Sequence, residues 1–291
     1  MSARPTVRFA PSPNGRLHLG HAYSALRNDE FARRDDGRFL LRIDDIDAQR
    51  SKPEFVAAII EDLAWLEVNF DATPRRQSAC LADYASALHA LEARGLVYPC
   101  FCARAALSRD GARDPDGAPL YDGTCRGLGA SEREARLAAG ERAALRLDMA
   151  RALPGAPLTW SEYGEGDEPR IEVANPMLWG DAILRGRGLP ASYHLCVVVD
   201  DAAQGITDVL RGRDLFQATS LHRLLQTLLD LPAPRYRHHR LALDASGAKL
   251  AKSRDSRSLK DLRDAGVTAA GVRAALLSGV APSSLPQFTL A

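Results

Sequence analysis

The chain has 291 residues, of which 46% are hydrophobic and 26% are charged, and its formal net charge at pH 7 is +1. This composition is typical of a globular enzyme with a large core, and the small net charge argues against a protein that binds nucleic acid over its whole surface. The sequence has neither an apolar run of the roughly 18 residues needed to cross a membrane nor an apolar signal core, so we expect a cytoplasmic protein without a membrane partner.

The first predicted elements are a short strand at residues 6–10, a loop, and a helix that begins near Gly20. Two prolines in the loop fix φ and remove backbone donors, which favours extended backbone there. His18 and His21 therefore lie near a helix N-terminus, where free N–H groups and the helix dipole attract anions. Gly20 has no side chain, so a flat ligand can approach its backbone. This combination predicts a site for a nucleotide triphosphate.

A second strand is predicted at residues 37–43, and a second helix after a capping box at residues 51–54. A third helix stops at Gly95, and the alternation of strands and helices predicts an α/β fold with a doubly wound parallel sheet. Asp44 follows the second strand, at the edge where such sheets bind ligands, although a solvated acidic loop would be the better explanation of this segment in isolation. The glycine patterns of dinucleotide-binding folds and P-loops are absent.

Three clustered cysteines, Cys100, Cys102 and Cys125, form the next feature. Their thiolates could converge on tetrahedral zinc, although three ordinary reduced cysteines would give the same pattern. No histidine lies between His89 and His194, so chemistry alone leaves five candidates for a fourth ligand: Asp110, Asp114, Asp116, Tyr121 and Asp122. The remaining cysteines, Cys80 and Cys196, are predicted to be packing residues in a helix and a strand.

The rest of the chain also alternates between predicted helices and strands. A second capping box, at Ser131 and Glu134, predicts a helix that ends at Gly140. Further strands are expected at residues 144–147, 170–173, 193–201 and 209–215, with an amphipathic helix at 221–231 and a hairpin at 241–249. Residues 235–263 are rich in lysine and arginine, which predicts a local basic surface for phosphates, although a solvated charged face is the simpler explanation.

Two motifs carry a resemblance to a known family. The run RFAPSPNGRLHLGH at residues 8–21 resembles the signature of class I aminoacyl-tRNA synthetases, in the form used by the glutamyl and glutaminyl branch. The run KLAKS at residues 249–253 resembles their second, lysine-containing signature, with two middle positions changed. The resemblance extends over the whole chain. It implies a Rossmann-like sheet in two parts, residues 1–96 and 180–235, an inserted zinc-binding acceptor-type subdomain at 97–179, and a lysine-loop region with a short helical C-terminus at 236–291.

The resemblance also implies residue roles. The catalytic residues would be His18, His21 and Lys252, and Gly20 and Lys249 would join them in binding ATP with Mg²⁺. Arg8 and Tyr193 would meet the side-chain carboxylate of glutamate, Arg211 its α-carboxylate and Asp44 its ammonium. Asp44 replaces the usual glutamate of the family, which keeps glutamine open as a substrate. Ser12 would add a hydrogen bond, in a pocket completed by Phe9, Ala10 and Pro11. One structural zinc would be held by Cys100, Cys102, Tyr121 and Cys125.

The chain ends about 40 residues after the lysine loop, so we expect no anticodon-binding domain. Short family members of this kind activate glutamate without tRNA and then attach it to queuosine in the anticodon of tRNA(Asp). This is the function expected here, in a monomer whose basic stretch at residues 235–263 contacts the tRNA. The alternatives are a truncated glutamyl-tRNA synthetase that charges the tRNA 3′ end, a nucleotidyltransferase, and a non-catalytic nucleotide-binding paralogue.

Overall fold

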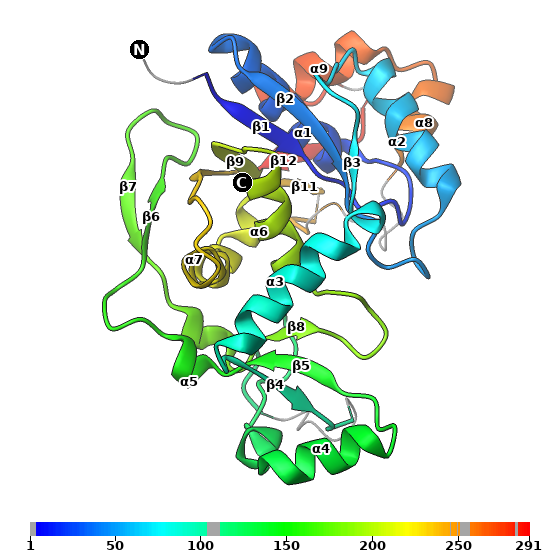
Figure 1. Ribbon diagram of the computed structural model, residues 1–291. Coiled ribbons are helices and arrows are strands. Elements are labelled where there is room, and N and C mark those ends of the chain that lie inside the picture. The colour runs from blue at the N-terminus through cyan, green and yellow to red at the C-terminus, as the bar shows by residue number, and fades with distance from the viewer. Residues whose placement is uncertain (1–3, 104–110, 245, 249, 251–256, 283–284) are drawn as a thin grey trace.

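The computed structural model describes residues 4–103, 111–244, 246–248, 250, 257–282 and 285–291. The first part of the chain forms a parallel sheet in which Thr6 of the first strand lies opposite Arg38 of the second (Figure 1). Its strands and helices are β1 (Thr6–Phe9), α1 (Leu19–Arg34), β2 (Arg38–Ile43), α2 (Pro53–Trp65) and β3 (Arg75–Arg76). These bounds confirm the predicted strands at the start of the chain and the helix after the signature loop.

The second part of the parallel sheet comes from the later chain. Strands β9 (Asp208–Gly212) and β6 (Thr159–Glu162) flank β10 (Arg235–His239) in parallel, and β7 (Arg170–Val173) runs antiparallel beside β6. The two parts meet where the Thr207 N–H donates to the Thr6 carbonyl (3.0 Å) and the Thr6 N–H donates to Oγ1 of Thr207 (2.9 Å). The predicted α/β architecture with parallel strands is therefore confirmed.

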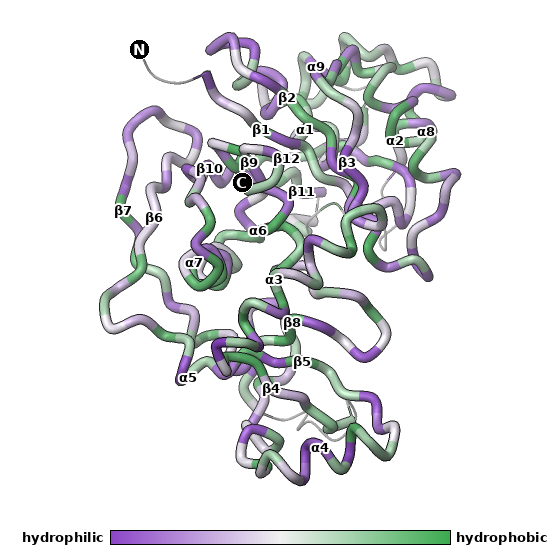
Figure 2. Tube along the Cα trace, in the orientation of Figure 1, coloured by the Kyte–Doolittle hydropathy of each residue, from purple (hydrophilic) through white to green (hydrophobic). Residues whose placement is uncertain are grey.

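A smaller antiparallel sheet projects from this body, at the lower end of the molecule in Figure 1. It consists of β4 (Val97–Cys100), β5 (Ala144–Leu147) and β8 (Ile183–Arg185), with α4 (Ala130–Ala138) below it. Figure 2 shows hydrophilic and hydrophobic residues alternating along α4, as expected of a surface helix. Two strand pairs cross the domain boundary expected at residue 180. Strand β8, after this boundary, pairs with β5 before it, and β10, after the boundary, pairs with β6 before it.

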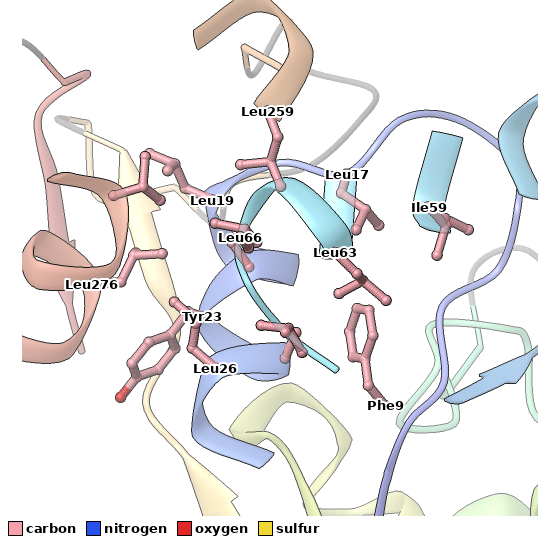
Figure 3. Close-up of a cluster of buried hydrophobic side chains, with 14 of the residues drawn as sticks. Phe9, Leu17, Leu19, Tyr23, Leu26, Ile59, Leu63, Leu66, Leu259 and Leu276 are labelled. Carbon is pink, nitrogen blue, oxygen red and sulfur yellow. The ribbon is translucent and has the colours of Figure 1, made fainter. Parts of the chain in front are cut away.

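The main core lies around α1, which packs against α9 (Ala269–Ser278). Figure 3 shows Leu17 and Leu19, on either side of His18, among leucines of α2 and the C-terminal helices. Burial of these two neighbours fixes the start of α1 and the loop before it. The remaining regular elements are α3 (Leu81–Ala93), α5 (Met149–Ala152), α6 (Tyr193–Ala203), α7 (Ala218–Leu228), β11 (Ala242–Asp244), α8 (Leu259–Asp264) and β12 (Phe288–Leu290).

The prediction of a strand at residues 193–201 was wrong, because this segment is helix α6. The hydroxyl of Ser192 caps it by accepting from the Leu195 N–H, and the helix packs on α3 and α7. Its apolar residues are consecutive because the helix is buried on nearly every side, so the run shows no helical period. Cys196 is consequently a buried helical residue and not a strand residue.

At residues 241–249 the chain folds back as predicted, because the Asp244 N–H donates to the Ala248 carbonyl (2.8 Å) and the Leu250 N–H donates to the Ala242 carbonyl (3.2 Å), and β11 also pairs with β12 near the C-terminus. Two predictions of helix caps were wrong. Helix α2 begins directly at Pro53 after Lys52, without a side-chain cap. Helix α4 begins at Ala130 after Gly129, again without a side-chain cap. A proline at the first position tolerates a missing cap because it lacks the N–H that a cap would satisfy.

Candidate active site

The two signature histidines each accept a hydrogen bond from a backbone N–H group at the start of α1. Nδ1 of His18 accepts from the Gly20 N–H (3.1 Å), and Nδ1 of His21 accepts from the His18 N–H (3.3 Å). The two rings are 3.8 Å apart between centroids. Because Nδ1 is an acceptor in both rings, the proton of each neutral ring lies on Nε2. A Cβ at Gly20 would lie 3.0 Å from the His18 ring, so glycine also leaves room for this cap.

A cavity of about 570 Å³ opens beside this helix start, between the two parts of the parallel sheet. Every described residue that the sequence predicted for glutamate or ATP lines it: Arg8, Phe9, Ala10, Pro11, Ser12, His18, Gly20, His21, Asp44, Tyr193 and Arg211. The roles of these residues stay predictions, although their convergence on one cavity is now established. Lys249 and Lys252 lie outside the described residues, and Leu250, which lies between them in the sequence, lines the cavity.

Arg8 and Asp44 belong to a buried network that includes two residues the sequence analysis did not single out, Arg42 and Asp201. Asp201 accepts two hydrogen bonds from Arg8 (2.9 and 3.3 Å) and one from Arg42 (2.5 Å). Arg42 also donates to Asp44 (2.7 Å) and is fully buried. An arginine near the end of an apolar strand, two residues before an aspartate, was the available signal.

The pKa values of the two carboxyl groups in this network are shifted in opposite directions. Burial raises the pKa of Asp44, against the opposing charge of Arg42. Burial alone would also raise the pKa of Asp201, but the charges of Arg8 and Arg42 outweigh it, and the pKa of Asp201 is lowered. Asp201 is therefore the firmly ionised partner, and Asp44 is the carboxylate at the cavity wall.

Arg211 is held differently, because every group it donates to is uncharged. It donates to Nε2 of His238 (3.1 Å), Nδ1 of His222 (3.1 Å), the Leu215 carbonyl (3.1 Å) and Oγ1 of Thr219 (2.8 Å). Within the described ranges, no carboxylate lies within ion-pair distance of its guanidinium. Arg211 thus lines the cavity as a buried, rigidly held cation that can bind an anionic ligand.

The three clustered cysteines form a second site in the smaller sheet. Their sulfur atoms lie within 4.8 Å of one another, and Cys102 is 3.4 Å from Cys125. The Tyr121 hydroxyl lies 3.5 Å from the Cys102 sulfur. Sulfur ligands of tetrahedral zinc are about 3.8 Å apart, so this set fits such an ion.

The aspartates that chemistry alone left open as zinc ligands are used elsewhere. Asp114 accepts from the Ala118 N–H, Asp122 accepts from Thr124, and Asp116 contacts His194. Asp110 lies outside the described residues. Tyr121 is therefore the nearest candidate for a fourth ligand among the described residues of this loop.

Most described cations of the basic stretch predicted at residues 235–263 are paired with acidic side chains of the protein. Part of it is the buried strand β10, whose arginines face the buried Asp208. Five of its described cations have acidic neighbours: Arg235 and Arg237 at Asp208, Arg240 at Glu165, Lys260 at Asp264, and Arg263 at Glu61. The expectation of an open basic surface was therefore wrong for these residues.

A buried parallel sheet, a helix start capped by two histidines and a cavity lined by four arginines are features typical of a nucleotide-dependent α/β enzyme. The family described as tRNA synthetases class I (E and Q), catalytic domain, matches residues 5–290. The chain belongs to this family. No helix within the described residues is long and apolar enough to span a membrane.

Comparison with individual relatives gives the extent of the similarity. The chain is 43% identical to the glutamyl-Q tRNA(Asp) synthetase of Rhodobacter capsulatus, covering 92% of this chain and 98% of that protein. It is 41% identical to glutamate–tRNA ligase 2 of Nitrosococcus oceani, covering 89% of this chain but 56% of that protein. Among solved structures, a glutamate tRNA ligase from Elizabethkingia meningosepticum in complex with its amino acid matches with a TM-score of 0.71 and 27% identity, over 86% of this chain and 52% of that one.

Proposed function

We propose that this protein activates L-glutamate with ATP, without needing tRNA, and then transfers the glutamate to queuosine in the anticodon of tRNA(Asp). Three relatives named glutamyl-Q tRNA(Asp) synthetase support this, because the chain is 38–43% identical to them and covers 83–98% of their length. The chain covers 56–60% of glutamate–tRNA ligases of similar identity. We infer that it acts as a monomer in the cytoplasm.

The charged residues at the cavity support glutamate as the amino acid that is activated. The ion pairs at the cavity join Arg8 to Asp201, and Arg42 to both Asp201 and Asp44, so that two arginines share Asp201. Asp200, which is also near Arg42, has Arg75 as a further partner at 2.8 Å. Glutamate carries one net negative charge at neutral pH, whereas glutamine carries none. Arg8, which shares Asp201 with Arg42, would therefore favour the side-chain carboxylate of glutamate over the uncharged amide of glutamine.

In the first step, an oxygen of the glutamate α-carboxylate attacks the α-phosphorus of ATP, and the bond to pyrophosphate breaks. Arg211 would hold the α-carboxylate, Arg8 and Tyr193 the side-chain carboxylate, and Asp44 the ammonium. His18 and His21 can donate from Nε2 toward phosphate oxygens, because their Nδ1 atoms accept backbone hydrogen bonds. Lys249 and Lys252 would add positive charge, and Mg²⁺ bound with ATP would neutralise the pyrophosphate.

In the second step, a queuosine hydroxyl attacks the acyl carbon of glutamyl-adenylate, loses its proton, and AMP leaves. An anticodon loop is single-stranded and can turn one base outward, which suits a compact cavity. We further infer that the cysteine cluster binds one structural Zn²⁺ through Cys100, Cys102, Tyr121 and Cys125. That ion would stabilise the small sheet and take no part in the chemistry.

The activation step is tested by ATP–pyrophosphate exchange with glutamate or glutamine, each with and without tRNA. We expect exchange with glutamate alone, and weaker exchange with glutamine. An absolute requirement for tRNA, or a preference for glutamine, would contradict the proposal.

The acceptor is tested with tRNA(Asp) from cells that make queuosine and from cells that cannot, using labelled glutamate. We expect labelling of the queuosine-containing tRNA only, and weaker binding at higher salt because phosphates contribute to it. Equal labelling of both tRNAs would instead identify an enzyme that charges the 3′ end.

A further inference from the structure

Two chains of hydrogen bonds lead away from Arg211, each passing through histidine and ending at a carboxylate. In the first chain, His238 contacts Arg211 through Nε2 (3.1 Å) and Glu162 through Nδ1 (2.6 Å). In the second, Arg211 contacts Nδ1 of His222 (3.1 Å), and Nε2 of His222 contacts Nδ1 of His194 (3.1 Å). Nε2 of His194 then meets Oδ2 of Asp116 (2.9 Å).

Arginine fixes the direction of every bond in both chains, because a guanidinium can only donate. His222 must accept at Nδ1, so its proton lies on Nε2 and is donated to His194. By the same reasoning, His194 accepts at Nδ1 and donates from Nε2 to Asp116. His238 accepts at Nε2 and donates from Nδ1 to Glu162. Burial, followed by the charge of Arg211, lowers the pKa of His222, which keeps this ring neutral.

The second chain connects two distant parts of the molecule. His194 and His222 are buried residues of α6 and α7. Asp116 instead belongs to the loop between Cys102 and Tyr121, in a turn closed by the Asp114 N–H and the Ala118 carbonyl (2.8 Å). Its side chain is 52% exposed, yet its carboxylate points at the buried His194. The loop that joins the predicted zinc ligands therefore supplies the last acceptor of a chain that starts in the cavity.

We propose that Asp116, His194 and His222 are positioning residues that orient the guanidinium of Arg211, so that the loop of the cysteine cluster tunes the affinity for the substrate carboxylate. This inference rests on the proposed function, in which Arg211 binds the α-carboxylate. A carboxylate in direct contact with Arg211 would compete with the substrate. Two neutral rings in between hold the guanidinium in place and leave its positive charge available.

The first experiment replaces Asp116, because its exposed loop position separates its role from folding. Asp116→Ala removes the acceptor for His194, and we expect the KM for glutamate in the exchange reaction to rise roughly 3- to 10-fold, the effect of about one net hydrogen bond. Asp116→Asn keeps an acceptor oxygen and should restore a KM close to wild type. The KM for ATP and the zinc content should not change in either variant.

The matched control is Glu141→Ala, which removes an exposed negative charge from the same subdomain. We expect its KM for glutamate to equal that of wild type. If Asp116→Ala also has the wild-type KM, or if Asp116→Asn is as impaired as Asp116→Ala, the relay is overturned while the proposed function stands. If wild type shows no glutamate-dependent exchange, the proposed function fails, and the relay fails with it.

A second measurement does not depend on activity. Nitrogen-15 NMR of the histidine side chains in the intact protein should show neutral His222 with its proton on Nε2 and neutral His238 with its proton on Nδ1. In Asp116→Ala, the signals of His194 and His222 should shift and those of His238 should not. A His222 proton on Nδ1 in wild type, or unshifted His194 and His222 signals in Asp116→Ala, would overturn the relay.

Discussion

Arg211 illustrates how the surroundings of a single residue decide what it can bind. Four of the five donors of its guanidinium are bound by imidazole, hydroxyl and carbonyl acceptors, which leave its charge unneutralised at the cavity wall. Arg8, by contrast, is bound at two positions by Asp201. Two arginines that the sequence presents as similar therefore have different capacities for an anionic substrate.

We predict that Arg211→Lys weakens glutamate activation by about 1.5–3 kcal/mol, because an ammonium cannot reproduce the planar fork that binds both carboxylate oxygens. The measurement is kcat/KM for glutamate in ATP–pyrophosphate exchange, with the KM for ATP as an internal reference. Arg38→Lys, at an exposed position, is the control. Equal loss for glutamate and ATP would contradict a role at the carboxylate.

Asp62 is a residue whose charge works against the fold. It is completely buried in α2, and burial raises its pKa to about 6. A carboxyl whose pKa is raised by folding contributes stability below its unfolded pKa and loses that contribution as pH rises through about 6. The ionised form at neutral pH therefore destabilises the protein.

We predict that Asp62→Asn raises the free energy of unfolding at pH 7.5 by about 1–2 kcal/mol and leaves it nearly unchanged at pH 4. Urea unfolding of variant and wild type at both pH values provides the comparison. A variant that is less stable at pH 7.5 would show that the ionised carboxylate makes a favourable contact.

At the scale of an element, the side of the small sheet that holds the cysteines has little core of its own. Its cluster of buried side chains consists of Tyr98, Cys100, Tyr121, Cys125 and Ala144, whereas leucines of β5 and β8 belong to the larger cluster around α6 and α7. So few apolar groups supply little hydrophobic free energy, which is the situation in which small domains depend on a metal ion. The proposed zinc would therefore contribute to the folding of the loop between β4 and β5.

We predict that Cys100→Ala loses the bound metal and becomes sensitive to protease between β4 and β5, while kcat for exchange changes little. Metal analysis and limited proteolysis measure the two effects. Cys80→Ala should retain the metal, because Cys80 lies outside the cluster at the start of α3. One zinc per chain together with full protease resistance in Cys100→Ala would rule out this ligand set.

At the scale of the whole molecule, the cavity joins the two parts of the parallel sheet. Residues after β1 and β2 form one wall, and residues of β9 and the segment after β10 form another. A ligand that contacts both walls stabilises the native state through its binding free energy. The connected charges also make this stabilisation sensitive to the net charge of the ligand.

We predict that a non-hydrolysable analogue of glutamyl-adenylate, at 100 times its Kd, raises the free energy of unfolding by about 2.7 kcal/mol. The glutaminyl analogue at the same concentration should give a smaller increase, because its side-chain amide carries no charge to pair with Arg8. Thermal or urea unfolding with each analogue measures the difference. Equal stabilisation by both would contradict the charge argument for glutamate.

Local features explain which predictions succeeded. Strands β1 and β2, helix α1 and the end of α3 near Gly95 were predicted because their caps, glycines and apolar spacing act over a few residues. Helix α6 was mispredicted because it is buried on nearly every side, and a helix of this kind has no polar face to reveal its period. The basic stretch at residues 235–263 was misjudged because its acidic partners come from distant parts of the sequence.

The sequence by itself determined the family, the helix start at the signature histidines and the candidate residues of the cavity, because these depend on short contiguous motifs. Only the tertiary structure decided how those residues are held. Asp116 could be considered only as a metal ligand until folding placed its carboxylate 2.9 Å from His194. Hydrogen bonds act over about 3 Å in space whatever the separation along the chain, so packing of α6 and α7 alone could connect this loop to Arg211.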